Sequence, residues 1–267
     1  MTQKIYAGLK TAIHSKLRHL GVQVIRMPLG ASEYEVVKPL ASYSPWNSAP
    51  GFQSVYRQIQ NNTLVDIYRC WELWTLVEQT TKLRGAILEV GVWRGGSGAL
   101  IAKRASIVGI YDPVYLCDTF EGVVNARGNS DTAYRGGEHS DTSPEVVEKL
   151  LRRLDIGGVR ILKGVFPEQT ASLIPRNEKF RLCHIDVDSY QSAKDVMNWV
   201  WPRLVPCGVV VFDDYGFCGC EGVKALINEQ MHEPGRLVIH NLNGHAIVVK
   251  LPAAVGAPLC PPQISNH

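Results

Sequence analysis

The stretch Ala86–Leu100, AILEVGVWRGGSGAL, contains the first strand, turn and helix signals of an α/β fold. Residues 86–91 form a short, largely apolar run of the kind found in buried strands. Glycines 91, 95 and 96 follow, and glycine permits both a tight turn and close approach of a ligand to the backbone. Residues 97–105 have the pattern of a helix. The stretch therefore predicts a strand and a helix joined by a glycine-rich loop.

Strand and helix patterns continue to alternate along the chain from this stretch. Apolar strands separated by helices indicate a parallel sheet that is covered on both faces. The last two strands flank Asn243-Gly244, a dipeptide typical of an antiparallel hairpin. The expected strands are 86–91, 114–118, 159–163, 180–186, 208–213, 237–241 and 245–251, and the expected helices are 64–77, 97–105, 144–154 and 192–204.

These elements predict one doubly wound α/β domain. The helix 192–204 is expected to open with a capping box, Ser192-x-x-Asp195, and to end before Pro206. In sheets of this kind, ligands bind at the carboxyl ends of the strands, near the point where the strand order reverses. Candidate functional residues are therefore sought at the strand ends.

Length and composition exclude several classes of protein. The chain has 267 residues, of which 45% are hydrophobic and 20% charged, which excludes a disordered or collagen-like protein. Its longest apolar runs, such as 207–212, are too short for a membrane span. A net charge of +3 without a basic stripe disfavours nucleic-acid binding. Seven cysteines, an odd number, indicate free thiols in a reducing compartment, so we expect a soluble cytoplasmic protein.

The first 63 residues are expected to form a helical extension, with the main domain over 64–267. Residues 1–27 combine basic residues with apolar residues at helical spacing, without the apolar core of a secretory signal. A helix packed on the body of the protein or on a second subunit is favoured over a helix on a membrane surface. Residues 41–51 are turn-rich and predict an ordered loop.

The loop after the first strand has the form E-x-G-x-x-x-G-G-S over residues 89–97. It matches neither the dinucleotide fingerprint, because Trp93 stands where the second glycine belongs, nor a phosphate-binding P-loop. A nucleoside-type ligand without a pyrophosphate suits it, with the N–H groups of the next helix facing that ligand. Asp118, which ends the second strand, is placed to accept the hydroxyl hydrogens of a ribose. The alternatives are a plain glycine turn and an Asp118 that only caps the turn after it.

Acidic residues gather after the fourth and fifth expected strands. Asp186 and Asp188 follow one strand, and Asp213 and Asp214 follow the other. Neighbouring strands lie about 4.8 Å apart, so these carboxylates would converge and raise one another's pKa values. A divalent cation would relieve the repulsion, and oxygen ligands select Mg²⁺, Mn²⁺ or Ca²⁺ over zinc. The alternative is a set of helix caps and solvated strand ends.

Two further segments are candidates for a functional role. Residues 125–142 are polar, glycine-rich and long enough to close over the site as a functional loop. Within them, His139 is either a base or substrate contact, or a solvated loop residue. Cys218-Gly-Cys220 lacks a second cysteine pair or a histidine at ligand spacing, so we expect free thiols there instead of zinc.

Taken in order, the segments E-V-G-V-W-R-G-G-S, C-D-T-F-E-G, H-I-D-V-D-S-Y and V-F-D-D-Y-G resemble the macrocin/mycinamicin/novobiocin-type O-methyltransferases over roughly residues 64–251. The resemblance implies a Rossmann-like class I methyltransferase sheet of seven strands, the last one antiparallel. It also implies dependence on S-adenosylmethionine and usually Mg²⁺, with sugar hydroxyls of natural products as common acceptors.

The resemblance also implies roles for individual residues. Cofactor binding falls to Glu89, Gly91, Gly95, Ser97 and Asp118. Metal binding falls to Asp186, Asp213 and Asp214. Asp188 is the leading general base, with Asp186 and His139 as further catalytic candidates. Metal-dependent catechol methyltransferases typically carry Asp-Asn where this chain has Asp213-Asp214.

We therefore expect an O-methyltransferase that moves a methyl group from S-adenosylmethionine to a hydroxyl held at Mg²⁺ or Mn²⁺. The acceptor is expected to be a small molecule that carries a sugar, and the protein a homodimer. One alternative is a metal-dependent hydrolase on the same fold, which has no use for the glycine loop or Asp118. Another is a non-catalytic S-adenosylmethionine-binding module. Such a module is expected to lack the acidic residues at the strand ends, all of which are present in this chain.

Overall fold

The computed structural model describes residues 34, 37, 41–126, 128 and 131–253. The helix expected within residues 1–27 lies outside the described residues. The chain divides into two compact units, Met1–Leu40 and Ala41–His267, and the fold described below is that of the second unit. The expected division between residues 63 and 64 stays a prediction. None of the helices in the described part of the chain is both long enough and apolar enough to cross a membrane.

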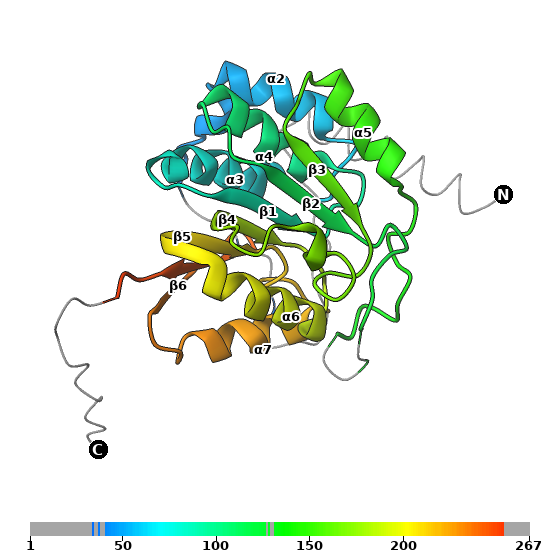
Figure 1. Ribbon diagram of the computed structural model, residues 1–267, viewed down its shortest axis with the longest axis vertical. Coiled ribbons are helices and arrows are strands. Elements are labelled where there is room, and N and C mark those ends of the chain that lie inside the picture. The colour runs from blue at the N-terminus through cyan, green and yellow to red at the C-terminus, as the bar shows by residue number, and fades with distance from the viewer. Residues whose placement is uncertain (1–33, 35–36, 38–40, 127, 129–130, 254–267) are drawn as a thin grey trace, which may run out of the picture. The chain divides into compact units, whose positions relative to one another are not determined.

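A seven-stranded sheet forms the centre of the second unit, in the order β3-β2-β1-β4-β5-β7-β6 (Figure 1). Its strands are β1 (Ala86–Val90), β2 (Val114–Asp118), β3 (Val159–Lys163), β4 (Phe180–Ile185), β5 (Leu204–Phe212), β6 (Arg236–His240) and β7 (Ala246–Lys250). The first five strands pair in parallel, and β7 runs antiparallel to β5 and β6. The predicted doubly wound fold with a terminal hairpin is confirmed. The strand order reverses between β1 and β4, where a ligand is expected.

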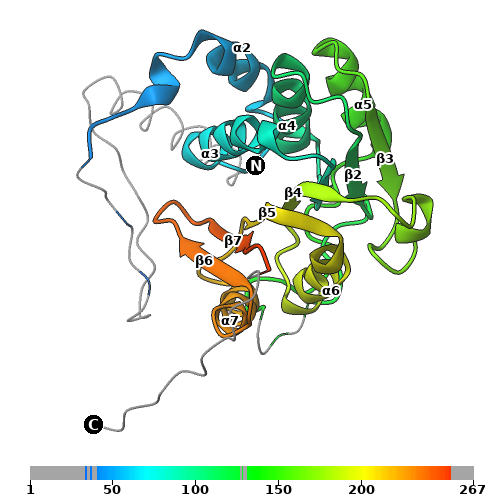
Figure 2. The same ribbon diagram turned by 60° about the vertical axis from the view of Figure 1, so that its left-hand side comes forward.

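Helices cover both faces of this sheet (Figures 1 and 2). One face carries α2 (Pro50–Ile59), α3 (Ile67–Gln79), α4 (Gly96–Ile107) and α5 (Pro144–Arg153), and the other carries α6 (Tyr190–Val200) and α7 (Glu221–Gln230). Short 3₁₀ helices are η1 (Pro45–Asn47), η2 (Thr80–Lys82), η3 (Ala171–Leu173) and η4 (Trp201–Arg203).

Two of the helices, α2 and α7, were not expected. Proline at the first position of a helix is tolerated, so Pro50 starts α2 inside the segment predicted as a loop. In α7 the buried residues Val223, Leu226, Ile227 and Gln230 follow the spacing of a helix that is apolar on one face. The signal for α7 was therefore present in the sequence.

Two hydrophobic cores lie on opposite faces of the sheet, because successive strand residues point to opposite sides. On β1, Ile87 belongs to the core that contains α2–α5, and Leu88 belongs to the core that contains α6 and α7. On β5, Val211 faces the first core and Phe212 faces the second. Asp213 and Asp214 follow directly after Phe212, at the carboxyl end of β5.

Helix α3 starts later and buries a different face than the apolar pattern suggests. The helix begins at Ile67, where the Asp66 carboxylate caps the N–H groups of residues 68 and 69. Leu64 and Tyr68 remain 64% and 53% exposed. The buried face instead consists of Arg69, Cys70, Leu73, Trp74 and Val77. Because Arg69 is a charged residue on this buried face, we infer that α3 has a role in addition to packing against the core.

The predicted capping box at the start of α6 is wrong. The helix begins at Tyr190, so Ser192 lies inside the first turn and its hydroxyl donates to the Val124 carbonyl at 3.2 Å. The Tyr190 N–H donates instead to the carboxylate of buried Asp131, at 3.0 Å. The helix also ends at Val200, and β5 already begins at Leu204 with a register shift in its pairing to β4, so Pro206 lies within β5. The loop before α5 thus supplies the cap that local spacing assigned to Ser192.

Candidate active site

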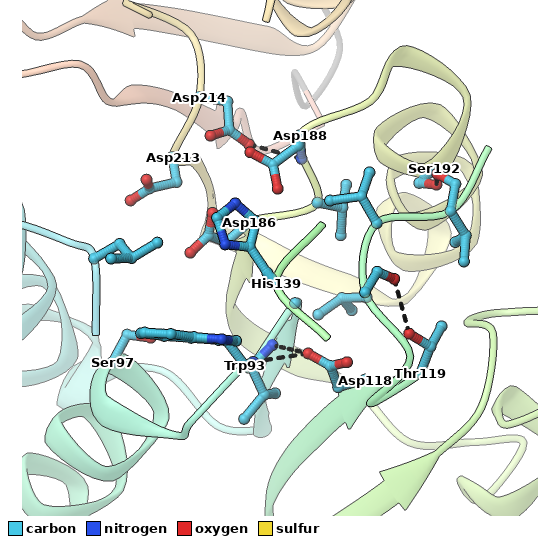
Figure 3. Close-up of a pocket in the computed structure, with 18 of the residues that line it drawn as sticks. Trp93, Ser97, Asp118, Thr119, His139, Asp186, Asp188, Ser192, Asp213 and Asp214 are labelled. Atoms are coloured by element: carbon cyan, nitrogen blue, oxygen red, sulfur yellow. Dashed lines mark hydrogen bonds between the residues drawn. The ribbon is translucent and has the colours of Figure 1, made fainter. Parts of the chain in front are cut away.

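A cavity of about 330 Å³ lies at the carboxyl ends of β1, β2, β4 and β5 (Figure 3). Its wall contains all but two of the predicted site residues, namely Gly91, Ser97, Asp118, His139, Asp186, Asp188, Asp213 and Asp214. The cavity therefore joins the glycine loop after β1 to the acids after β4 and β5. This position is the reversal point of the strand order, as expected for a doubly wound sheet.

Gly91 occupies a position that only glycine fits. Its φ is +89°, and a Cβ added there would overlap the backbone carbonyl oxygen of Asp186. The Asp186 N–H donates to the Val90 carbonyl at 2.9 Å. The ends of β1 and β4 are consequently in backbone contact, and the glycine loop lies directly beside the first acid of the cluster.

Glu89 and Gly95, both predicted to bind the cofactor, do not line the cavity. Glu89 is fully buried, and its Oε1 lies 2.9 Å from Nδ1 of His184. Its side chain lies beneath Gly98, where a Cβ would overlap Oε2 of the glutamate. Gly95 has a φ of +84° at the N-cap of α4, where a Cβ would meet the Val147 side chain. In this structure both residues support the loop from behind.

The Asp118 carboxylate holds the loops after β1 and β2 together. Its Oδ2 accepts hydrogen bonds from the N–H groups of Val92 and Trp93 at 2.6 and 2.7 Å (Figure 3). Its Oδ1 accepts from the N–H of Phe120 at 2.6 Å. An ionised carboxylate offers about four lone-pair positions. The capping role considered from the sequence is therefore present, and acceptor capacity is left on Oδ1.

The predicted functional loop reaches the cavity through His139 and Tyr134. The His139 ring lies 6.3 Å from the Trp93 ring and 6.1 Å from the Tyr134 ring, measured between centroids. Trp93 in turn donates from Nε1 to Asp141 at 2.8 Å. Trp93 and His139 both have positive φ values, +46° and +64°, a strained conformation that clusters at functional sites. The described part of this loop is therefore tied to the glycine loop beside the site.

Three acids meet at one end of the cavity (Figure 3). Asp186, Asp213 and Asp214 each offer a carboxylate oxygen, and these oxygens lie within 4.8 Å of one another. Asp188 lines the same wall with a φ of +61°, and its N–H donates to Oδ2 of Asp214 at 2.9 Å. The predicted convergence of the strand-end acids is confirmed.

The neighbouring acids differ in their electrostatics. Burial raises the pKa of Asp214 well above its usual value, and the nearby carboxylates of Asp188 and Asp186 raise it further. Burial also raises the pKa of Asp186 well above its usual value, with the Asp213 charge adding to the effect. For Asp188, burial again raises the pKa.

Asp213 shows the opposite shift. Burial alone would favour its protonated form, but the two buried histidines beside it and the charge of Arg69 outweigh burial and hold its pKa below the usual range. Its Oδ1 lies 2.8 Å from Nε2 of His245 and 3.5 Å from Nε2 of His184, and its Oδ2 pairs with the Arg69 guanidinium. The pKa of His184 is shifted as well. Burial lowers it, but the carboxylates of Asp213 and Glu89 outweigh this effect and raise it to about 10. Asp213 is thus an ionised carboxylate whose negative charge is balanced by Arg69 and the neighbouring histidines.

The acid cluster fits a hard divalent cation. All three groups are carboxylates, the donor type that Mg²⁺ and Mn²⁺ prefer. The raised pKa values of Asp186 and Asp214 indicate negative charge that the described residues do not compensate. A bound cation would relieve this charge directly. Asp186, Asp213 and Asp214 are therefore the residues that would hold it.

Sequence reasoning missed Arg69, Glu72, His184 and His245. A signal existed for His184, because a histidine within the otherwise buried run of β4 requires a partner. Arg69, Glu72 and His245 carried no local signal, because their partners lie on other elements. In the described part of the chain no disulfide links the cysteines, in agreement with the expected free thiols, and these are Cys70, Cys117, Cys183, Cys207, Cys218 and Cys220. The expectation that Cys218 and Cys220 hold no zinc stays a prediction.

Solved structures share this fold. The structure of the O-methyltransferase NovP aligns with a TM-score of 0.61 at 23% identity, covering 72% of this chain and 83% of that one. The calicheamicin methyltransferase CalS11 aligns with a TM-score of 0.59 at 15% identity, covering 79% of this chain and 99% of that one. At these identities the likeness concerns the fold.

Curated relatives are similar in sequence over part of their length. The 8-demethyl-8-(2,3-dimethoxy-α-L-rhamnosyl)-tetracenomycin-C 4'-O-methyltransferase of Streptomyces olivaceus is 31% identical over 60% of this chain, and the match spans 64% of that relative. The mycinamicin III 3''-O-methyltransferase of Micromonospora griseorubida is 30% identical over 60% of this chain and 67% of its own length. The match to the first relative therefore covers less than two thirds of that protein.

A family comparison covers the whole region that carries the site. The family model of macrocin O-methyltransferase (TylF) matches residues 58–234, which include α3, the glycine loop, Asp118 and all the clustered acids. This match extends over more than half of the chain and confirms the resemblance found in the sequence. The chain belongs to the macrocin O-methyltransferase (TylF) family.

Proposed function

We propose that this protein is an S-adenosylmethionine-dependent O-methyltransferase that acts on a hydroxyl of a small, sugar-bearing molecule. One observation carries the proposal. The glycine loop, Asp118 and the acid cluster line a single cavity, in which Gly91 lies in backbone contact with Asp186. A nucleoside-type cofactor and a polar acceptor would therefore meet at the point where β1 and β4 diverge.

The cofactor is proposed to bind at the β1 and β2 side of the cavity. Gly91 allows close approach to the backbone, and Ser97 lines the cavity from the first turn of α4, the end of a helix that attracts polar ligand atoms. The remaining capacity of Asp118 Oδ1 suits one ribose hydroxyl while its other contacts hold the loop. Glu89 and Gly95 are proposed to act indirectly, by supporting this loop.

The acceptor is proposed to bind at the acid side of the cavity. Asp186, Asp213 and Asp214 would hold Mg²⁺ or Mn²⁺, which lowers the pKa of a hydroxyl and orients it when bound. Asp188 is the proposed general base. Its raised pKa brings this carboxyl closer to the range in which it accepts a proton at neutral pH. The sulfonium of the cofactor is a good leaving group, so the remaining task of the site is alignment.

His139 is the second candidate for proton transfer or acceptor contact. It lines the cavity and is close enough to Asp188 to lower the pKa of that carboxyl electrostatically. Thr63, the last residue of the predicted N-terminal segment, also lines the cavity, which supports an acceptor role for the end of that segment. We further propose that residues 1–63 contribute to dimer contacts and that the protein is a cytoplasmic homodimer.

A sugar acceptor is supported by the relatives. Two of them are named for methylation of a 4'- or 3''-hydroxyl, one of them on a rhamnosyl group. A sugar with two adjacent hydroxyl groups suits a cation held by the clustered carboxylate oxygens, because both hydroxyls could bind that cation. Screening of sugar-bearing acceptors would identify the hydroxyl that this protein methylates.

Calorimetric titration with S-adenosylhomocysteine, with and without Mg²⁺, is the first test. Micromolar binding is expected, followed by transfer of label from [methyl-¹⁴C]S-adenosylmethionine to rhamnosyl glycosides in the presence of Mg²⁺. Asp118→Ala should abolish binding, whereas Glu233→Gln, at an exposed residue, should not change it. A wild-type protein that binds no S-adenosylhomocysteine would favour the metal-dependent hydrolase, and one that binds it but methylates no acceptor would favour the non-catalytic module.

A further inference from the structure

Helix α3 contacts both oxygens of the Asp213 carboxylate by separate routes. Arg69 reaches Oδ2 directly, through its guanidinium. One turn later on the same helix, Oε2 of Glu72 lies 2.7 Å from Nδ1 of His245, and Nε2 of that histidine lies 2.8 Å from Oδ1 of Asp213. Asp213 is therefore held at Oδ2 by α3 directly and at Oδ1 by His245, which α3 contacts through Glu72.

Glu72 is fixed in this arrangement by the turn between β6 and β7. Asn243 donates to its Oε2 at 2.7 Å, and Asn241 donates to its Oε1. His245 is fully buried, and the Glu72 side chain is 14% exposed. These contacts hold the histidine between two carboxylates without its reaching the cavity wall.

The other two acids of the cluster are held less firmly. The Asp214 carboxylate accepts the N–H of Asp188, and no hydrogen bond to the Asp186 carboxylate is found within the described residues. A ligand whose orientation is already set loses less conformational freedom when a cation binds. Asp213 is therefore the member of the cluster that the fold has oriented in advance.

We propose that Glu72 and His245 are positioning residues that hold Asp213 in the orientation needed to bind a divalent cation. The inference rests on the metal site of the proposed function and extends it to residues that touch neither the cavity nor a substrate. Loss of such outer contacts typically weakens metal affinity 10–100-fold. The effect should concern the cation and spare the cofactor, whose proposed contacts lie on β1 and β2.

The test measures Mn²⁺ affinity by electron paramagnetic resonance in wild type, Glu72→Gln, His245→Gln and the double variant. Each single variant is expected to raise the Kd for Mn²⁺ at least about tenfold, within the range for outer contacts. The double variant should lose little more than the larger single effect, because both residues act through one path. Affinity for S-adenosylhomocysteine should stay within about twofold. Glu78→Gln is the matched control, since Glu78 lies on the same helix and pairs with Arg104 instead.

Thermal melts establish that each variant is folded at the temperature of the titration. If His245→Gln does not fold, Glu72→Gln, a nearly isosteric change at a partly exposed side chain, decides the question. Unchanged Mn²⁺ affinity in the folded variants, or no Mn²⁺ binding by the wild type, would overturn the positioning role. The proposed methyl transfer is judged separately, because S-adenosylhomocysteine binding and label transfer are measured on the same wild-type sample.

Discussion

Asparagine substitutions at Asp213 and Asp214 are expected to change stability in opposite directions, although the two residues are adjacent. Asp213 is 3% exposed and pairs with Arg69, whose side chain is 8% exposed. Removing one partner of a buried ion pair typically costs about 3–5 kcal/mol. For a domain of this size each kcal/mol shifts Tm by about 2–4 °C, so Asp213→Asn should lower Tm by roughly 6–20 °C.

Asp214 is 6% exposed and has carboxylates as its charged neighbours, namely Asp188, Asp186 and Asp213. Its pKa is raised well above the usual value by burial and by these carboxylates, so the charged form of Asp214 destabilises the folded, metal-free protein. Asp214→Asn removes the charge, and its amide oxygen can still accept the N–H of Asp188. The metal-free variant should therefore be more stable than wild type and melt at a higher temperature.

The two effects also depend on pH with opposite signs. The pKa of Asp214 is higher in the folded than in the unfolded protein, so its contribution to the stability of the metal-free protein falls as pH rises above about 4. The stability gained by Asp214→Asn therefore increases with pH over the same range. The folded pKa of Asp213 lies below its unfolded value, so its contribution is present above about pH 4 and disappears as pH falls through the folded pKa.

Thermal melts followed by circular dichroism, in EDTA between pH 2 and 8, measure both effects. Glu233→Gln serves as the control at an exposed acid and should leave Tm unchanged within about 1 °C, as surface substitutions do. Equal destabilisation by the two asparagine variants would refute the reasoning, because it would show that Arg69 and the histidines do not distinguish Asp213 from Asp214. Adding Mg²⁺ should stabilise wild type more than either variant.

Three further changes test other parts of the structure. Gly91→Ala should abolish S-adenosylhomocysteine binding and lower Tm, because its Cβ overlaps the Asp186 carbonyl and φ is +89°; calorimetry showing intact binding would contradict the close approach of β1 and β4. Asp131→Ala removes the acceptor for the first N–H of α6 and should cost about 1–2 kcal/mol in urea unfolding, while a loss under about 0.3 kcal/mol would show that this cap is dispensable. Ellman's reagent should modify the exposed thiols of Cys207 and Cys218 in the native protein well before the buried ones, and equal rates across all thiols would contradict their burial.

The strands and the position of the cavity could be predicted from the sequence. The boundaries of β2 and β3 coincide with the predicted 114–118 and 159–163. The buried strand β2 is a nearly continuous apolar run, and the partly buried edge strand β3 lies between Gly158 and Gly164. Strand ends in a doubly wound sheet meet at one edge, so the convergence of Gly91, Asp118 and the acids followed from their order in the chain. The capping box failed because a residue of a distant loop, Asp131, supplies the cap.

The partners of the acids were decided by the tertiary structure alone. Local patterns report on neighbours within a few residues, whereas Arg69 and Asp213 are 144 positions apart, and Glu72 and His245 are 173 apart. The order of residues therefore predicted which carboxylates gather after β4 and β5, but treated Asp213 and Asp214 as equivalent. In the structure Asp213 pairs with Arg69 of α3, whereas Asp214 accepts the N–H of Asp188, and this difference in surroundings shifts their pKa values in opposite directions.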